Sequence, residues 1–212
     1  MAIIQAGKRK ANKREFFETP PKLCDVAVGL LTSRVTQNRP RFLDAGAGTG
    51  NWGRAVVKRF RDRGKLVGVD LYFSRPKIQN PYSEFHQLDF SRPLTAGFPG
   101  IIAGYTAIVG NPPFKSAEQF VRVAYDLLIP GGYILFLLRL SFLESIKRHH
   151  GLWNDLPPEV VYVLAERIPW ANHKQGKNGK TDDTAYALYL WRKPLRGTCK
   201  GHSTLLDWLS WR

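Results

Sequence analysis

The tetrapeptide Asn111-Pro112-Pro113-Phe114 has the residue types that could hold an amino group for reaction. The side-chain oxygen of Asn111 can accept a hydrogen bond, and the Pro112 carbonyl can accept a second one, since proline brings no competing N–H donor. Two acceptors at one spot suit an exocyclic amino group such as N6 of adenine, whose lone pair would then face an electrophilic methyl group. Phe114 would offer a face for stacking a flat base, worth about 1–3 kcal/mol. The alternative is a plain turn, because Asn and Pro are ordinary turn residues.

A glycine loop lies upstream of this tetrapeptide. Residues 44–50 read Asp-Ala-Gly-Ala-Gly-Thr-Gly, and glycines let a backbone turn tightly and approach a ligand closely. The glycines alone fit a dinucleotide or another nucleotide. The neighbouring acids discriminate: Asp44 would repel a pyrophosphate but suit the ammonium of an amino acid, Asp70 would suit ribose hydroxyls, and Asp89 an adenine amino group. An amino acid, a ribose and an adenine are the three parts of S-adenosylmethionine. The alternative is that Asp44 and Asp70 only cap the following helices.

Alternating strands and helices must position these motifs. Seven apolar runs predict strands, at residues 41–44, 66–70, 85–88, 106–110, 133–138, 160–164 and 185–191. Helices are predicted from the prolines at 20 and 21 to Leu31, from the glycine loop to about Arg63, and from about Ser116 to Leu128. We expect an α/β fold with a central, mostly parallel, seven-stranded sheet and helices on both faces. Each motif follows a strand, so the motifs would meet at the carboxyl edge of the sheet.

The charge is strongly basic and concentrated at the two ends of the chain. The 212 residues hold 32 Lys and Arg against 17 Asp and Glu, a net charge of +15. Residues 1–41 carry nine basic and three acidic side chains, and residues 165–212 carry nine and four, so +11 lies at the ends. This excess predicts nucleic acid as the partner, with phosphates held by Lys8–Arg14 and by the loop that bears Lys174, Lys177 and Lys180. The alternative is a basic, solvated surface.

Other classes of protein are disfavoured. No apolar run approaches the roughly 20 residues of a membrane span, and residues 1–10 are too polar for a secretory signal, so we expect a cytoplasmic protein without membrane contact. Cys24 and Cys199 have no paired spacing with each other or with histidine, so neither a disulfide framework nor a metal site is expected. We expect residues 1–15 to form a basic arm and residues 16–212 a single domain with a basic C-terminal extension.

The motifs resemble, in their order, the gamma-class (Taq-type) adenine N6 DNA methyltransferases of restriction-modification systems. The resemblance rests on Phe17-Glu18-Thr19-Pro20-Pro21, the glycine loop, Asp70, Asp89 and the tetrapeptide at 111–114. Residues 140–144 and 186–191 resemble small phage-encoded relatives. The resemblance implies a Rossmann-like, class I S-adenosylmethionine-dependent methyltransferase fold. Sequence-specific relatives carry a separate target-recognition domain, and no stretch of this chain is long enough to be one, so a partner protein that supplies specificity is left open.

The resemblance also implies roles for individual residues. The target amino group would be held by the catalytic residues Asn111, Pro112, Pro113 and Phe114. The cofactor would be bound by Thr19, Pro20, Asp44, Ala45, Gly46, Gly48, Gly50, Asp70, Leu71, Asp89, Phe90 and Asn111. The expected activity is methylation of N6 of adenine in nucleic acid, with DNA preferred over RNA. Two alternatives stay open: a protein glutamine N5-methyltransferase, since the same acceptors suit a side-chain amide, and a nucleic-acid-binding module whose methyltransferase fold is inactive.

Overall fold

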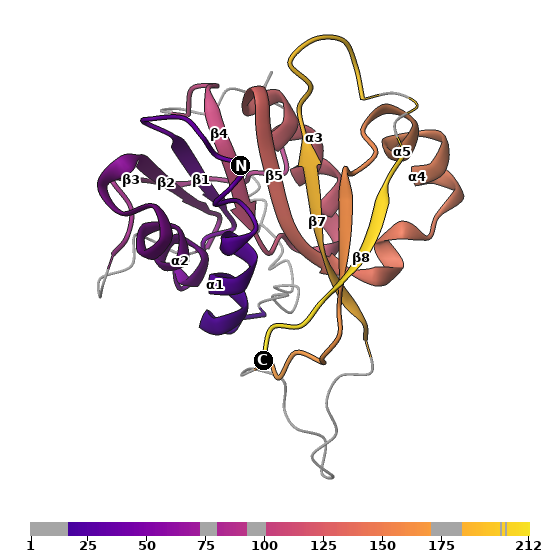
Figure 1. Ribbon diagram of the computed structural model, residues 1–212, viewed down its shortest axis with the longest axis horizontal. Coiled ribbons are helices and arrows are strands. Elements are labelled where there is room, and N and C mark those ends of the chain that lie inside the picture. Colours follow the sequence, from indigo (N-terminus) through magenta and orange to yellow (C-terminus); the bar gives the residue numbers. More distant parts are fainter. Residues whose placement is uncertain (1–16, 73–79, 93–100, 171–183, 200, 202) are drawn as a thin grey trace, which may run out of the picture.

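The computed structural model describes residues 17–72, 80–92, 101–170, 184–199, 201 and 203–212 (Figure 1). Its strands are β1 (Arg41–Ala45), β2 (Lys65–Asp70), β3 (Glu84–Gln87), β4 (Tyr105–Gly110), β5 (Leu128–Arg139), β6 (Val160–Leu164), β7 (Tyr186–Arg192) and β8 (Leu205–Leu209). Its α-helices are α1 (Pro21–Gly29), α2 (Asn51–Phe60), α3 (Ala117–Leu127), α4 (Ile146–His150) and α5 (Leu152–Asp155), with short 3-10 turns at Arg61–Arg63, Phe114–Ser116 and Leu140–Leu143.

The described strands form one sheet in the order β3-β2-β1-β4-β5-β7-β6-β8. Strands β1 to β5 run parallel to one another, whereas β7 is antiparallel to both β5 and β6. The strand order reverses at the middle, because β2 lies on one side of β1 and β4 on the other. Ligands of open parallel sheets bind beyond the carboxyl ends of the strands at such a reversal. The glycine loop follows β1 and the tetrapeptide follows β4, so both stand at that position.

The central strands are mostly apolar because both of their faces are covered. All six residues of β4 are buried, and so are four of the five residues of β1. Parallel strands that are covered on both faces lack the apolar–polar alternation of half-exposed strands. Their composition and flanking glycines, and not an alternating pattern, therefore predicted them. Gly110 ends β4 with φ +156°, and a Cβ there would lie 2.3 Å from the Ala45 carbonyl oxygen. The close approach of the ends of β1 and β4 therefore requires glycine at this position.

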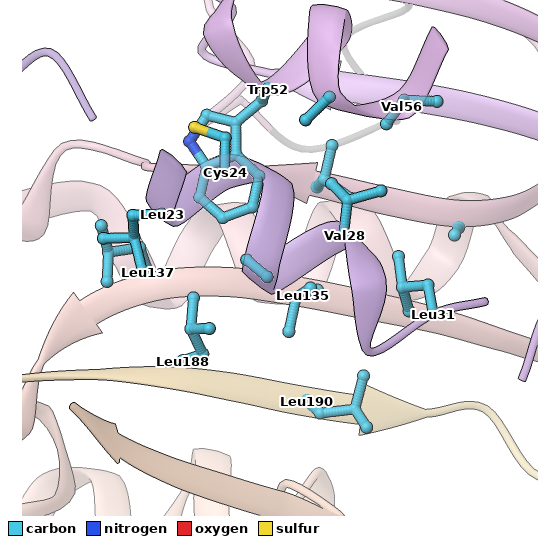
Figure 2. Packing of buried hydrophobic residues seen from close by; sticks show 14 of the residues in the cluster. Leu23, Cys24, Val28, Leu31, Trp52, Val56, Leu135, Leu137, Leu188 and Leu190 are labelled. Carbon is cyan, nitrogen blue, oxygen red and sulfur yellow. The ribbon is translucent and has the colours of Figure 1, made fainter. Parts of the chain in front are cut away.

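Helices cover both faces of the sheet, as predicted. Helix α1 begins at Pro21, where a proline in the first turn loses no hydrogen bond, and it packs against α2. Figure 2 shows α1 lying over β5 and β7, with Trp52 and Val56 of α2 beside it. Leu23 of the helix and Leu31 in the turn after it face leucines of the two strands, which are Leu135, Leu137, Leu188 and Leu190. Helix α3 buries Phe120, Val121 and Ala124 on the other face, with Leu152 of α5 in the same cluster. The two layers hold the sheet rigid beneath the site.

The sheet has eight strands, so the prediction of seven was wrong. All seven predicted strands are present, and β8 is an eighth, pairing parallel with β6 at the edge of the sheet (yellow in Figure 1). It lies within the segment that the sequence analysis treated as a basic extension. Leu205, Leu206 and Trp208 are exposed on it. A strand exposed on both faces gives no alternating pattern, so only its backbone pairing with β6 identifies it.

Candidate active site

A cavity of about 500 Å³ opens at the carboxyl ends of β1, β2, β3 and β4. This volume is within the usual range of small-molecule sites, about 300–1,000 Å³. Nine predicted site residues line it: Thr19, Gly46, Gly48, Asp70, Leu71, Asp89, Phe90, Asn111 and Pro113. Six predicted site residues are not among the lining residues: Pro20, Asp44, Ala45, Gly50, Pro112 and Phe114. The structure thus brings together residues from five segments that are far apart in the chain.

The glycine loop is fixed against the end of β2. The backbone N–H groups of Gly46 and Ala47 both donate to the Val69 carbonyl at 2.9 Å, and that of Gly48 donates to Asp70 Oδ2 at 2.9 Å. Asp70 Oδ1 accepts from the Tyr72 backbone N–H at 2.8 Å. Each carboxylate oxygen can accept more than one hydrogen bond, so Asp70, which lines the cavity, is oriented by the backbone and can still accept from ribose hydroxyls.

Asp44 is held behind the loop. Its side chain is fully buried, and its Oδ2 accepts from the Tyr82 hydroxyl at 2.6 Å and from the Gly53 backbone N–H at 2.9 Å. Gly53 belongs to the first turn of α2, so Asp44 does cap the helix, as the alternative interpretation of the sequence held. Its Oδ1 is buried without a partner among the described residues. Burial raises the pKa of the Asp44 carboxyl to about 7, against the lowering effect of the Tyr82 and Gly53 hydrogen bonds.

Glu18 is the acid that lines the cavity beside the glycine loop, and the sequence analysis assigned it no role. Its Oε1 accepts from Thr49 Oγ1 at 2.8 Å and from Asn51 Nδ2 at 3.2 Å. Its Oε2 has no hydrogen bond from any residue that the structure describes. A ligand ammonium could therefore bind Glu18 more directly than Asp44. The sequence signal that could have identified Glu18 is its position next to Thr19, in the motif Phe17-Glu18-Thr19-Pro20-Pro21.

Asn111 has its side-chain amide oriented by the segment before α1. Its Nδ2 donates to the Phe17 carbonyl at 2.9 Å and to Thr19 Oγ1 at 3.2 Å. A carbonyl can only accept, so the NH₂ group must face Phe17 and the oxygen must face the other way. That oxygen has no hydrogen-bond donor among the described residues, and Asn111 lines the cavity. Asn111 thus offers this oxygen as an acceptor within the described structure, and its contact with a target amino group stays a prediction.

The other residues of the tetrapeptide are placed differently from one another. Pro113 lines the cavity, whereas Pro112 is buried and does not. The Phe114 ring packs 5.6 Å from Phe17 and 5.8 Å from Tyr186, between ring centroids, and the Arg139 guanidinium lies 4.5 Å above it. One face of Phe114 is therefore covered. The prediction that this ring stacks on a base stays a prediction.

The far end of the cavity is suited to a flat apolar group with polar edges. Phe90 is buried with its ring centroid 5.2 Å from that of Phe120, and both residues line the cavity. Asp89 beside them accepts from Ser91 through the backbone N–H at 3.0 Å and the hydroxyl at 2.6 Å, both at Oδ1. Its Oδ2 lies 3.7 Å from Arg92. The binding of an adenine by Asp89 and Phe90 stays a prediction.

Solved structures of class I S-adenosylmethionine-dependent methyltransferases share this fold. A candidate enzyme of that class from Listeria monocytogenes has a TM-score of 0.61 at 15% identity, over 90% of this chain and 65% of its own. The type I restriction-modification methyltransferase subunit of Streptococcus thermophilus has a TM-score of 0.61 at 13% identity, over 92% and 47%. TrmN of Thermus thermophilus has a TM-score of 0.53 at 19% identity, over 79% and 48%.

These similarities establish the fold class. The chain has the Rossmann-like fold of class I S-adenosylmethionine-dependent methyltransferases, and it spans between about half and two thirds of the length of these three structures. A scan against protein-family models finds no match, and a search of curated proteins finds none either.

Further findings concern only the described part of the chain. None of its helices is long and apolar enough to cross a membrane, and it contains no cluster of three His, Cys, Asp or Glu side chains able to hold a metal ion. The basic arm at Lys8–Arg14 and the lysines at 174, 177 and 180 lie outside the described residues. Their contact with phosphates stays a prediction.

Proposed function

We propose that this protein transfers a methyl group from S-adenosylmethionine to the N6 amino group of adenine in nucleic acid, in DNA in preference to RNA. The observation that carries the proposal is the Asn111 amide, which is oriented by Phe17 so that a free oxygen remains on a residue of the cavity. A strand-end asparagine with a free acceptor, at the edge that also bears the glycine loop, is what an amino-group substrate requires.

The residues of the cavity fit the proposed cofactor. Glu18 has one unpartnered carboxylate oxygen for an ammonium, Asp70 can accept from ribose hydroxyls, and Phe90 lies in an apolar slot next to Asp89 for an adenine. Thr19 stands between the two halves of the site, since its hydroxyl accepts from both Trp52 and Asn111. When bound, S-adenosylmethionine supplies an electrophilic methyl group on a sulfonium. No metal is needed in this scheme.

The proposed chemistry rests on positioning. Asn111 Oδ1 accepts one N–H of the target amino group. The Pro112 carbonyl as acceptor of the other N–H stays a prediction, because Pro112 does not line the cavity. Held in this way, the nitrogen can lose planarity and direct its lone pair at the methyl group. The N–CH₃ bond would form as the S–CH₃ bond breaks to leave a neutral thioether, and the excess proton on the nitrogen would pass to water. A base inside a duplex cannot reach the cavity, so the target adenine is flipped out or is already unpaired, the former at a cost of about a few kcal/mol.

Asn111→Ala tests the proposal. We expect loss of methyl transfer at saturating cofactor, with little change in the dissociation constant for S-adenosylmethionine measured by calorimetry. Asn111 also supports Thr19, so Thr19→Val is the control: it removes the same 3.2 Å hydrogen bond, together with the one that Trp52 donates to Thr19, but leaves the amide oxygen in place. Thr19→Val should weaken cofactor binding and retain turnover at saturation. If both variants keep turnover, or both lose it equally at saturation, Asn111 does not hold the target.

A further inference from the structure

Arg139 stands at the carboxyl end of β5, beside the tetrapeptide. Its guanidinium lies 4.5 Å from the centroid of the Phe114 ring, and Phe114 follows Pro113, which lines the cavity. One face of the guanidinium is thus used by the ring. The edge of the guanidinium carries the N–H groups, and these remain available to bind another partner.

That edge has no partner among the described residues. Arg139 Nε is buried and makes no hydrogen bond, and no carboxylate of the described chain forms an ion pair with this side chain. Arg148 makes a useful contrast, because it also lies over a ring, that of Phe142, yet donates to the carbonyls of Phe142 and Glu144. A buried N–H without an acceptor is costly, so its presence at Arg139 calls for a ligand.

A second orphan donor lies in the same aromatic cluster, which consists of Phe17, Phe114, Trp170 and Tyr186. The Trp170 ring packs 5.2 Å from Phe17 and 5.1 Å from Tyr186, and its Nε1 is buried without a partner in the described structure. Both N–H groups border this cluster, and each lacks an acceptor among the described residues. Because an arginine is among them and the chain has a net charge of +15, an anionic ligand fits best.

We infer that Arg139 binds a phosphate of the nucleic-acid strand, next to the nucleotide whose base enters the cavity. This inference rests on the proposed function and names a contact that none of the motifs supplies. The planar N–H fork matches two phosphate oxygens, and stacking on Phe114 holds the fork at a fixed angle. Arg139 thereby acts as a positioning residue, since it fixes the strand while Asn111 holds the amino group.

Arg139→Gln tests the inference, and Arg41→Gln is its matched control. The Arg41 guanidinium also lies over a ring, 4.8 Å from the centroid of Tyr105, but Arg41 begins β1 and therefore stands at the opposite edge of the sheet. Both variants remove one positive charge. The probe is a fluorescent single-stranded oligothymidylate with one deoxyadenosine, and binding is measured by anisotropy across a series of potassium chloride concentrations.

The inference predicts that Arg139→Gln flattens the slope of log affinity against log salt by about 0.7, the value for one phosphate on a single strand. Arg41→Gln should leave the slope unchanged. In transfer assays Arg139→Gln should raise the KM for the oligonucleotide and leave the affinity for S-adenosylmethionine unaltered, and Arg139→Lys should restore part of the loss. Equal slopes for the two glutamine variants would overturn the inference.

An oligonucleotide with neutral methylphosphonate linkages on both sides of the deoxyadenosine distinguishes a contact of Arg139 with a phosphate from a contact with a base edge. If Arg139 holds a phosphate, these linkages weaken binding by the wild type and have no further effect on Arg139→Gln. Additive losses would instead mean that Arg139 contacts a base, and the phosphate assignment would be wrong. A wild type that transfers no methyl group to any oligonucleotide refutes the proposed function, whereas an active wild type with an unaffected Arg139→Gln refutes only this inference.

Discussion

The buried pair of Asp44 and Tyr82 makes the free energy of unfolding depend on pH, and Tyr82→Phe should increase that dependence. The hydroxyl donates to Asp44 Oδ2 over 2.6 Å, and burial raises the pKa of the carboxyl to about 7. In an unfolded chain the pKa of Asp is about 3.9. Since the folded-state pKa is the higher one, the contribution to stability is fully present below about pH 4 and is lost as the pH rises through about 7. A shift of about three pH units corresponds to roughly 4 kcal/mol.

The loss of stability expected for Tyr82→Phe depends on whether Asp44, which accepts from the Tyr82 hydroxyl, is ionised. A hydrogen bond to a charged group contributes about 1.5–3 kcal/mol, and one between neutral groups about 1 kcal/mol. Loss of the hydroxyl should lower the free energy of unfolding by roughly 2 kcal/mol near pH 8, where the carboxylate is ionised, and by roughly 1 kcal/mol near pH 5. Urea denaturation followed by circular dichroism at the two pH values measures the difference.

Tyr105→Phe is the matched control for this substitution. Tyr105 is also fully buried, but its hydroxyl has no hydrogen-bond partner in the described structure. Its removal should leave the stability unchanged or raise it by about 1 kcal/mol, equally at both pH values. Equal losses for Tyr82→Phe at the two pH values, or no loss at all, would refute the assignment of Asp44 as a buried carboxyl that ionises near neutrality.

Two further substitutions test the site and its support. Glu18→Gln should weaken binding of S-adenosylmethionine by about 10- to 100-fold, because a charge-assisted hydrogen bond is lost. It should not affect binding of methylthioadenosine, which lacks the ammonium. Calorimetry with both ligands measures the two affinities, and equal losses for the two would exclude an ammonium contact. Gly110→Ala should destabilise the fold by about 3 kcal/mol or more, because its Cβ would clash with Ala45 as well as strain the backbone. Gly197→Ala, where a Cβ meets nothing within 4 Å at φ +79°, should cost only about 1 kcal/mol; similar melting temperatures for the two variants would contradict the close approach.

The sequence predicts the central part of the fold well because its signals are local. Strands β1 and β4 are mostly apolar and are followed by the glycine loop or by Asn-Pro, so both the strands and the motifs after them could be found by inspection. Strand β8 could not be found, because Leu206 and Trp208 are exposed and its position depends on pairing with β6.

The direction of side chains could not be predicted. Asp44 follows the pattern of a ligand-binding acid, yet its carboxylate turns to α2 and Tyr82, which lies 38 residues away in the chain. Glu18 reaches the glycine loop only because α1 packs against α2, and its contact with Thr49 spans 31 residues. Such contacts depend on the packing of elements, which no spacing of residues reveals.

The most direct test of the account is the identity of the methylated product. The protein is incubated with S-adenosylmethionine labelled in its methyl group, together with single-adenine DNA, the corresponding RNA and a glutamine-containing peptide, and the products are digested and analysed by mass spectrometry. The account predicts labelled N6-methyladenine nucleoside, more from DNA than from RNA, and none with Asn111→Ala. Label on the peptide, on another base, or on no substrate would contradict it.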